Sequence, residues 1–318
     1  MMRIEILWKE ILSDVEKLEV SDGEYLLRLI DPNAPFIFFA GIDSANNFLI
    51  AIEINSTPPD INLESESLIY FRNKRKSGTW LMGIRLDKID LAPVFGKLCQ
   101  DLIDAASGMP SQAALITFFK DRLNLWKKLF QNSNRGLLEK HQIKGLMAEL
   151  IALEYLLQSS EGSMLSVLMA WTGPDKADQD FIFNDRAIEV KAISPSSTKV
   201  GISSIEQLDS TLPMELWVYV LKDSSGDEVG DLNLISQTLK IEQILSMQPK
   251  VVNIFKDKMI QAGYVENVFY EKYCFNVLSI NKYIVSELFP KLSRKQLPGG
   301  VLEASYSISI SAIDQYRT

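Results

Sequence analysis

The chain has 318 residues with 33 basic and 41 acidic side chains, a net charge of −8, one histidine (His141) and two cysteines (Cys99 and Cys274). So few potential ligands exclude a structural zinc site, a multi-cysteine iron–sulfur centre and a disulfide-rich secreted scaffold. No stretch approaches the roughly 20 apolar residues of a membrane span and no signal peptide is recognisable, so we expect a soluble cytoplasmic protein of two domains.

The first hundred residues are predicted to be rich in strands. A helix is expected within Ile11–Ile30, before Pro32. Four strands follow, at residues 36–42, 47–54, 67–71 and 79–86, and the turn residues at 43–46 predict a hairpin of the first two. From about Leu91 the apolar spacing becomes helical. We therefore expect a β-rich N-terminal domain over residues 1–108 and a second domain over residues 109–318.

The second domain is predicted to mix helices and strands. Long helical patterns cover residues 113–130 and 135–158, and a further helix is expected to open at 203–208. The later elements are strands at 181–183, 187–193, 216–221, 274–280 and 304–310, and helices at 241–247 and 251–262. The run at 216–221 is continuously apolar, as in a strand that is covered on both faces. The fold class is therefore α/β (α+β).

Charge is unevenly spread along the chain. Residues 1–70 hold 4 basic and 13 acidic side chains, a net of −9, whereas residues 72–76 carry +4 and residues 119–145 carry +5. The basic stretches are either solvated faces or surfaces that contact phosphates.

The segment Asp180–Ala192 is predicted to form a β-hairpin. Asn184-Asp185 suits a two-residue turn in which both residues take positive φ. Asp180 then lies opposite Glu189, and directly opposed residues share a face of the sheet. A four-residue loop would keep Asp180 on that face, whereas a three-residue loop would move it to the other one.

Glu189 and Lys191 are two residues apart on the predicted strand, so they also share a face. Two carboxylates and an ammonium gathered in this way suit Mg²⁺, which binds through one or two carboxylates, waters and phosphate oxygens. The lysine can orient or deprotonate an attacking water, or stabilise the charge of a transition state.

Glu149 lies among apolar neighbours in a strong helical pattern, Leu146–Leu153. A carboxylate there is costly to bury unless it is paired or serves a metal site. The alternative is an ordinary exposed glutamate, which is how we interpret Glu154.

A helix glutamate followed by an aspartate, a Glu-x-Lys pair and a glutamine resembles the PD-(D/E)XK superfamily of restriction-endonuclease-like nucleases. Glu149, Asp180, Glu189, Lys191 and Gln207 match these positions, within a core of about residues 135–225. The resemblance implies a restriction-endonuclease-like core, which is a mixed central sheet flanked by helices, with a C-terminal α/β extension. It also implies metal ligation by Asp180, Glu189 and the carbonyl group of Val190.

Three acids compete for the hairpin position, because the literal Pro-Asp pair is Pro174-Asp175 and Gln179 precedes Asp180. Asp180 is favoured because hairpin geometry places it against Glu189. Asp178 has the same parity and is the second choice, and Asp175 is assigned to a Gly-Pro turn.

The resemblance implies a Mg²⁺-dependent DNA endonuclease, with Mn²⁺ as a substitute, in a bacterial restriction-modification or defence system. The whole chain is similar to an uncharacterised branch whose members lie beside methyltransferase and ATPase genes. DNA, such partner proteins and a second copy in a homodimer are therefore the expected partners, with no membrane, and the N-terminal domain would contact DNA or a partner. Two alternatives stay open: a catalytically inactive DNA- or protein-binding module on this fold, and an unrelated α/β protein whose Glu-x-Lys is accidental.

Overall fold

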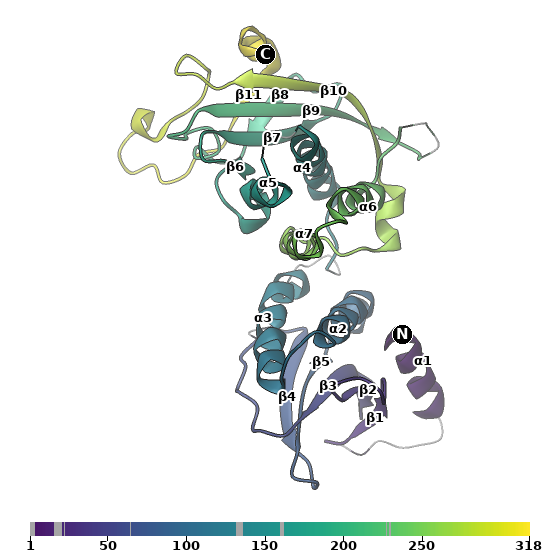
Figure 1. The fold of residues 1–318 in the computed structure, drawn as a ribbon. Helices are drawn as coiled ribbons and strands as arrows, with labels where there is room; N and C mark the ends of the chain where they lie inside the picture. The colour runs from purple at the N-terminus through teal and green to yellow at the C-terminus, as the bar shows by residue number, and fades with distance from the viewer. Residues whose placement is uncertain are drawn as a thin grey trace. The chain divides into compact units, whose positions relative to one another are not determined.

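The computed structural model describes residues 4–15, 21, 23–63, 65–131, 136–159, 162–226, 228 and 230–318. These ranges contain eight α-helices and three β-sheets, a mixed α+β architecture (Figure 1). The chain divides into two compact units, Met1–Leu137 and Leu138–Thr318. The first unit ends later than the predicted boundary at residue 108, because the helix predicted at 113–130 packs against the helix before it.

Unit 1 is built on an antiparallel five-stranded sheet in the order β1-β2-β3-β5-β4. The strands are β1 (Tyr25–Leu29), β2 (Phe38–Asp43), β3 (Phe48–Ile54), β4 (Leu68–Lys74) and β5 (Trp80–Leu86). The hairpin predicted for residues 36–42 and 47–54 is confirmed, because β2 pairs with β3 and Ile42 lies opposite Phe48. Asn46 turns this hairpin with a φ of 63°, in the left-handed region that asparagine tolerates.

The helices of unit 1 are α1 (Ile4–Val15), α2 (Ala92–Ala106) and α3 (Gln112–Gln131). Trp8 of α1 stacks on Phe48 and on Phe95 of α2, with ring centroids 4.8 and 5.3 Å away. The helix predicted within Ile11–Ile30 has the wrong bounds. It ends at Val15, and Tyr25–Leu29 is a strand because that segment pairs with β2. Residues 16–20 and 22 lie outside the described ranges.

The helices of unit 2 are α4 (Lys140–Gln158), α5 (Met164–Ala170), α6 (Leu234–Leu245), α7 (Pro249–Gln261) and α8 (Ile310–Ile313). Its strands are β6 (Phe181–Ile182), β7 (Ala187–Ile193), β8 (Lys199–Ile202), β9 (Met214–Ser224), β10 (Cys274–Ile284) and β11 (Tyr306–Ser309). Short 3-10 helices of unit 2 are η2 (Gly173–Asp175), η3 (Val268–Lys272), η4 (Arg294–Gln296) and η5 (Asp314–Tyr316), and unit 1 contains η1 (Ile89–Leu91). None of the helices in the described ranges has the length and apolar character needed to cross a bilayer.

The central sheet of unit 2 has the order β10-β9-β7-β6 and is mixed, because β7 and β9 are parallel and the other pairs are antiparallel. On one face the Tyr155 ring of α4 meets Trp217 of β9 at 5.5 Å. On the other face Leu216 and Val218 pack against the two-stranded sheet β11-β8. The prediction that this strand is covered on both faces is confirmed, although one cover is a sheet rather than a helix.

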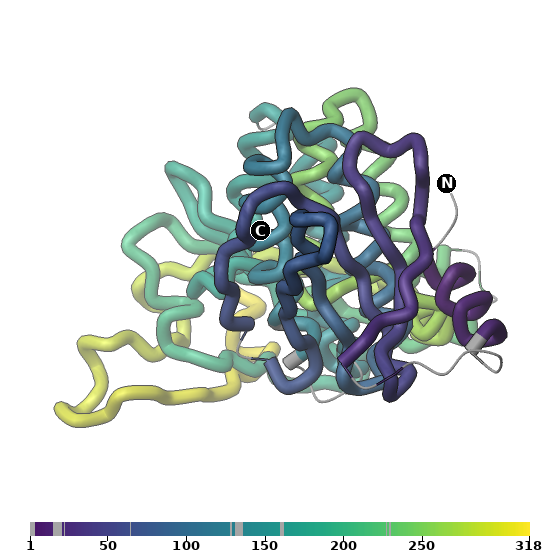
Figure 2. Tube along the Cα trace, turned by 90° about the horizontal axis from the view of Figure 1, so that it is seen from below, coloured from purple at the N-terminus to yellow at the C-terminus, as the bar shows by residue number. Residues whose placement is uncertain are grey.

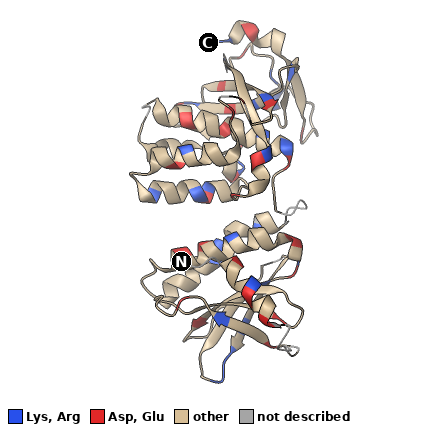
Figure 3. Cartoon of the chain, turned by 90° about the vertical axis from the view of Figure 1, so that its right-hand side faces the viewer, with Lys and Arg blue, Asp and Glu red and all other residues tan. Residues whose placement is uncertain are grey.

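Several side chains of the two basic stretches, residues 72–76 and 119–145, form ion pairs with acidic residues elsewhere in the chain. Arg72 and Arg75 pair with Asp60 and Glu53, at 3.1 and 2.5 Å. In the second stretch Arg122 pairs with Asp101 and Lys140 with Asp223. Figure 3 shows the two signs of charge interspersed along the helices. Arg135, which contributes to the second stretch, lies outside the described residues.

Candidate functional site

The predicted hairpin exists as β6 and β7, and its register is confirmed. Phe181 pairs with Ile188, and the Phe183 amide donates to the carbonyl of Arg186 at 2.8 Å, so the loop between them is Asn184-Asp185. The expected positive φ is wrong, because neither loop residue has one. The loop parity alone places Asp180 next to Glu189.

Asp180 lies where the β6–β7 ladder ends. Because β6 is two residues long, the amide of Val190 has no strand partner on that side. Asp180 Oδ2 accepts this N–H at 2.8 Å, so the carboxylate satisfies a backbone donor that would otherwise be buried and unpaired. The amides of Thr172 and Gly173 in turn donate to the carbonyl of Asp180, at 2.8 and 3.0 Å. Both the backbone and the side chain of Asp180 are therefore held.

Glu189, Lys191 and Gln207 form a connected group. Lys191 Nζ donates to Glu189 Oε1 at 2.5 Å and to Gln207 Oε1 at 3.0 Å. The amide of Ser203 donates to Gln207 Oε1 at 2.8 Å. The helix predicted at 203–208 is wrong: the segment is a turn, in which the Leu208 amide donates to the Ile205 carbonyl. Gln207 reaches the lysine because its side-chain oxygen bridges Lys191 and the start of this turn.

Glu149 approaches from α4 and is held by the segment 171–175. The indole N–H of Trp171 donates to Glu149 Oε2 at 2.9 Å. Gly173 lies against both acids, since a Cβ there would be 2.6 Å from Glu149 Oε2 and 3.0 Å from Asp180 Oδ1. A larger residue at this position would force the ends of these two carboxylate side chains to shift.

The electrostatics of this group are unfavourable without a further cation. Burial, and then the charge of Asp180, raise the pKa of Glu149 to about 8. Burial also raises the pKa of Asp180, and burial with the charge of Asp180 raises that of Glu189 well above its usual range. Lys191 opposes all three shifts but does not cancel them. One ammonium group, that of Lys191, therefore offsets the mutual repulsion of three neighbouring carboxyl groups only in part.

The structure distinguishes the three aspartates that are candidates for the hairpin position, Asp175, Asp178 and Asp180. Asp175 Oδ2 accepts from Lys258 Nζ of α7 at 2.8 Å, so the acid of the literal Pro-Asp pair is bound to another partner. Asp178 is exposed. Of the three, Asp180 is the acid bonded to the strand that carries Glu189 and Lys191.

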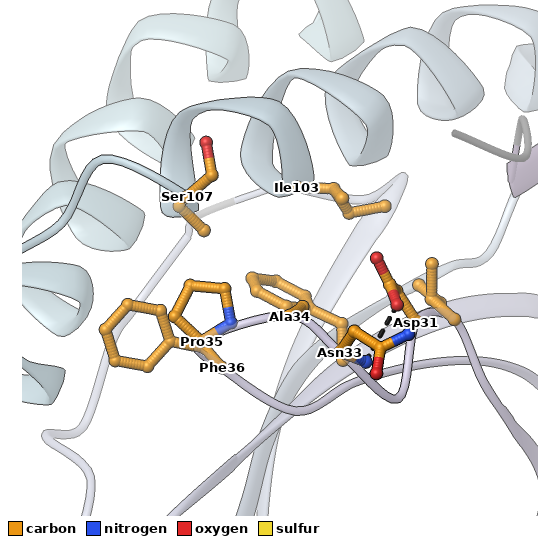
Figure 4. Close-up of a pocket in the computed structure, with 10 residues that line it drawn as sticks. Asp31, Asn33, Ala34, Pro35, Phe36, Ile103 and Ser107 are labelled. Carbon is orange, nitrogen blue, oxygen red and sulfur yellow. Dashed lines mark hydrogen bonds between the residues drawn. The ribbon is translucent and has the colours of Figure 1, made fainter.

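Two cavities differ in their lining. One of about 280 Å³ in unit 2 is bordered by Glu149, Gly173, Gln142 and Gln261, so one of the candidate acids lines it. The other, of about 220 Å³ in unit 1, lies between α2 and the loop before β2 (Figure 4). Its lining is mainly apolar with one carboxylate, Asp31, which accepts the amide of Asn33 at 2.8 Å. Only the first cavity is joined to the candidate residues.

The oxygen donors suit a hard divalent cation. Glu189 is 1 % exposed, and its Oε2 atom has no hydrogen-bond partner within the described ranges. An orphaned buried carboxylate oxygen requires an explanation, and a cation is one. No three His, Cys, Asp or Glu side chains of the described ranges stand together as a preassembled metal centre. Asp180 and Glu189 fit an ion that takes its other ligands from water and substrate.

Three contributors were missed by reasoning from sequence: Trp171, Gly173 and Lys258. Trp171 and Gly173 immediately precede the Pro174-Asp175 pair, and their only signal was that position. Lys258 lies in a helix whose apolar spacing carries no hint of a buried ammonium.

Comparison with known proteins identifies a family for the chain. A family model described as "Putative PD-(D/E)XK family member, (DUF4420)" matches residues 4–311, which includes all five candidate residues. No curated protein and no solved structure matches the chain significantly. The resemblance to the PD-(D/E)XK superfamily is thereby confirmed at the level of family, and the chain belongs to the DUF4420 family.

Proposed function

We propose that unit 2 is a divalent-metal-dependent nuclease that hydrolyses phosphodiester bonds in DNA. The observation that carries this proposal is the meeting of Asp180, Glu189 and Lys191 at the end of the hairpin, in a chain of this family. The proposed role in a restriction or defence system rests on the resemblance of the whole chain.

Asp180 and Glu189 would hold Mg²⁺ or Mn²⁺, with the carbonyl oxygen of Val190 as a further ligand. The orphaned Glu189 Oε2 supports this assignment, as does the glycine that leaves room for the acids. A bound divalent ion polarises the phosphate and lowers the pKa of a water ligand.

Lys191 would act on the attacking water or on the phosphate oxygens. Its Nζ atom is held by Glu189 and Gln207, and no third acceptor is found among the described residues. An ammonium has three N–H donors, so one is available for substrate. Fixing the amine from two sides keeps this donor in one direction, which favours catalysis over simple charge attraction.

Glu149 would exchange protons or hold water beside the ion. A carboxyl group whose pKa is about 8 carries a proton at neutral pH until a cation displaces it. Its position on the cavity of unit 2 gives that proton a route to solvent.

The test is a cleavage assay of the full chain on supercoiled plasmid DNA, methylated and unmethylated, with Mg²⁺ or Mn²⁺. We expect metal-dependent nicking or linearisation. Lys191→Ala and Asp180→Ala should each lower the rate by about 10²–10⁴-fold, because each removes a group that acts in the transition state.

Asp178→Ala is the matched control, since it removes a nearby but exposed carboxylate. It should cleave at the rate of the unmodified chain. Robust cleavage by the Asp180→Ala/Lys191→Ala double variant would refute the site, whatever the activity of the unmodified protein.

A second candidate function is a non-catalytic DNA- or protein-binding module on the same fold. The 2.5 Å Glu189–Lys191 ion pair favours it, because that pair already neutralises one acid. Calorimetry with Mn²⁺ separates the two: saturable binding that is lost in Asp180→Ala supports the nuclease, and no heat of binding at any concentration supports the module.

A further inference from the structure

A buried lysine stands behind the site. Lys258 of α7 is 5 % exposed, and lysine is almost never buried without partners. Its Nζ atom donates to the carbonyl of Trp171 at 2.5 Å and to Asp175 Oδ2 at 2.8 Å. Both acceptors belong to the segment 171–175, so the ammonium group binds that segment at both of its ends.

The segment 171–175, which Lys258 binds, contacts two of the candidate acids, Glu149 and Asp180. Trp171 donates its indole N–H to Glu149, and Gly173 packs against the carboxylates of Glu149 and Asp180. The ring of Phe255, one turn before Lys258 on α7, lies 6.2 Å from the Trp171 ring. The helix therefore fixes Trp171 by its carbonyl and by its ring.

We propose that Lys258 is a positioning residue for the site, which anchors the segment 171–175 so that Trp171 and Gly173 hold Glu149 and Asp180 in place. The proposal rests on the proposed function only for its consequence in catalysis. It also gives Asp175 a role: the acid of the literal Pro-Asp pair is the counter-ion of the anchor and not a metal ligand.

The contacts of Lys258 should matter more for the position of the segment 171–175 than for the stability of unit 2. The Asp175 side chain is 45 % exposed, and ion pairs that reach solvent stabilise folded proteins little. The carbonyl of Trp171, in contrast, is a backbone acceptor in a residue with no exposed surface, and it needs a donor. Removing the ammonium should therefore displace the segment more than it destabilises the unit.

The experiment follows the indole N–H resonances of the full chain by ¹⁵N NMR, in Lys258→Met and in the matched control Lys256→Met. Lys256 lies on the same helix, is 52 % exposed and is 3.9 Å from Glu242. The chain has five tryptophans, and Trp171→Phe assigns the resonance of interest. The other four report on folding: Trp8, Trp80, Trp126 and Trp217.

In Lys258→Met we expect the Trp171 resonance to move while Trp217 keeps its position, and the dissociation constant of Mn²⁺ to rise about 10-fold, as for loss of a residue that orients metal ligands. In Lys256→Met neither should change. A Trp171 resonance that stays in place, or that moves only together with Trp217, would overturn the proposal.

If Lys258→Met does not fold, Asp175→Ala decides. It removes one of the two acceptors and should move the Trp171 resonance in a folded chain, whereas an unmoved resonance rejects the anchor. Absence of Mn²⁺ binding in the unmodified chain would reject the proposed function, but the NMR comparison would still test the anchor.

Discussion

Two buried carboxylates, one in each unit, are treated very differently. Asp43 at the end of β2 is 5 % exposed, and its oxygens accept from the amides of Ala45 and Asn47, from the Asn47 side chain and from Arg85, at 2.9 to 3.1 Å. Glu189 of β7 is 1 % exposed, yet its Oε2 atom has no partner among the described residues.

We interpret the difference as one between a structural acid, Asp43, and the proposed metal ligand, Glu189. Saturating the lone pairs of a buried carboxylate recovers the solvation that it loses on folding, so Asp43 stabilises its turn. A carboxylate left half-paired beside two other acids costs stability, and such a cost is typical of sites that bind something. Both residues lie in strands and each pairs with a basic residue, Arg85 for Asp43 and Lys191 for Glu189, so burial and an ion pair do not distinguish them.

The largest effects are expected from two separate neutral substitutions, Glu189→Gln and Asp43→Asn. Glu189→Gln should weaken Mn²⁺ binding by at least about 100-fold, since it removes a ligand rather than a residue behind one. Asp43→Asn should leave Mn²⁺ binding unchanged and lower the free energy of unfolding by about 1–3 kcal/mol, because Arg85 and Asn47 lose an acceptor. Calorimetry and chemical denaturation of both variants measure the two effects. The contrast fails if the two variants behave alike in either measurement.

A smaller effect is expected in the pH dependence of stability. Folding raises the pKa of Glu149 from 4.5 to about 8, so the folded state binds a proton that the unfolded state releases in this window. The free energy of unfolding should therefore fall as pH rises from 4.5 to about 8. Glu149→Gln should make the profile flatter over that range, and Mn²⁺ should restore the stability of the unmodified chain most strongly at the alkaline end.

Thermal unfolding at a series of pH values, with and without Mn²⁺, measures this difference. Parallel profiles for the unmodified chain and Glu149→Gln would show that Glu149 titrates normally, and that the acids are not crowded in the folded state.

The smallest effect is expected from Gly173→Ala. The added Cβ would lie 2.6 Å from Glu149 Oε2, the end of a flexible side chain, so the glutamate can move aside. We expect a loss of about 1–3 kcal/mol in stability from overpacking and a severalfold weaker affinity for Mn²⁺. Gly201→Ala is the control, because nothing lies within 4 Å of its Cβ position. Equal Mn²⁺ affinities in the two variants would mean that Gly173 has no part in the site.

Local chemistry made the hairpin predictable from sequence. The parity of the loop at Asn184-Asp185 determines which residue opposes Glu189, whatever turn the loop adopts, and so the register was right although the positive φ was not. The Glu189 and Lys191 pair follows from the two-residue period of a strand. The β2–β3 hairpin of unit 1 was predictable for the same reason, since turn residues lie between two apolar runs.

Gln207 shows where local reasoning fails. Its segment has the spacing of a short helix, but Ile205 and Leu208 are fully buried and the chain follows their packing. The resulting turn brings the side chain to Lys191, and the segment 289–297 reinforces it: Lys291 donates to the Leu208 carbonyl at 3.1 Å and Arg294 pairs with Glu206. In Figure 2 this C-terminal segment belongs to the long yellow loop.

Local sequence was enough to predict the residue types of the candidate site, the hairpin that joins Asp180 to the strand of Glu189 and Lys191, and the family. These depend on neighbours a few residues apart and on turn parity. The tertiary structure shows what the alternative acid does, because Asp175 is bound by Lys258 from a helix more than 80 residues later. It also brought Glu149 to Asp180 across Gly173. Contacts between distant segments arise from the packing of whole elements, and no local pattern of residues encodes them.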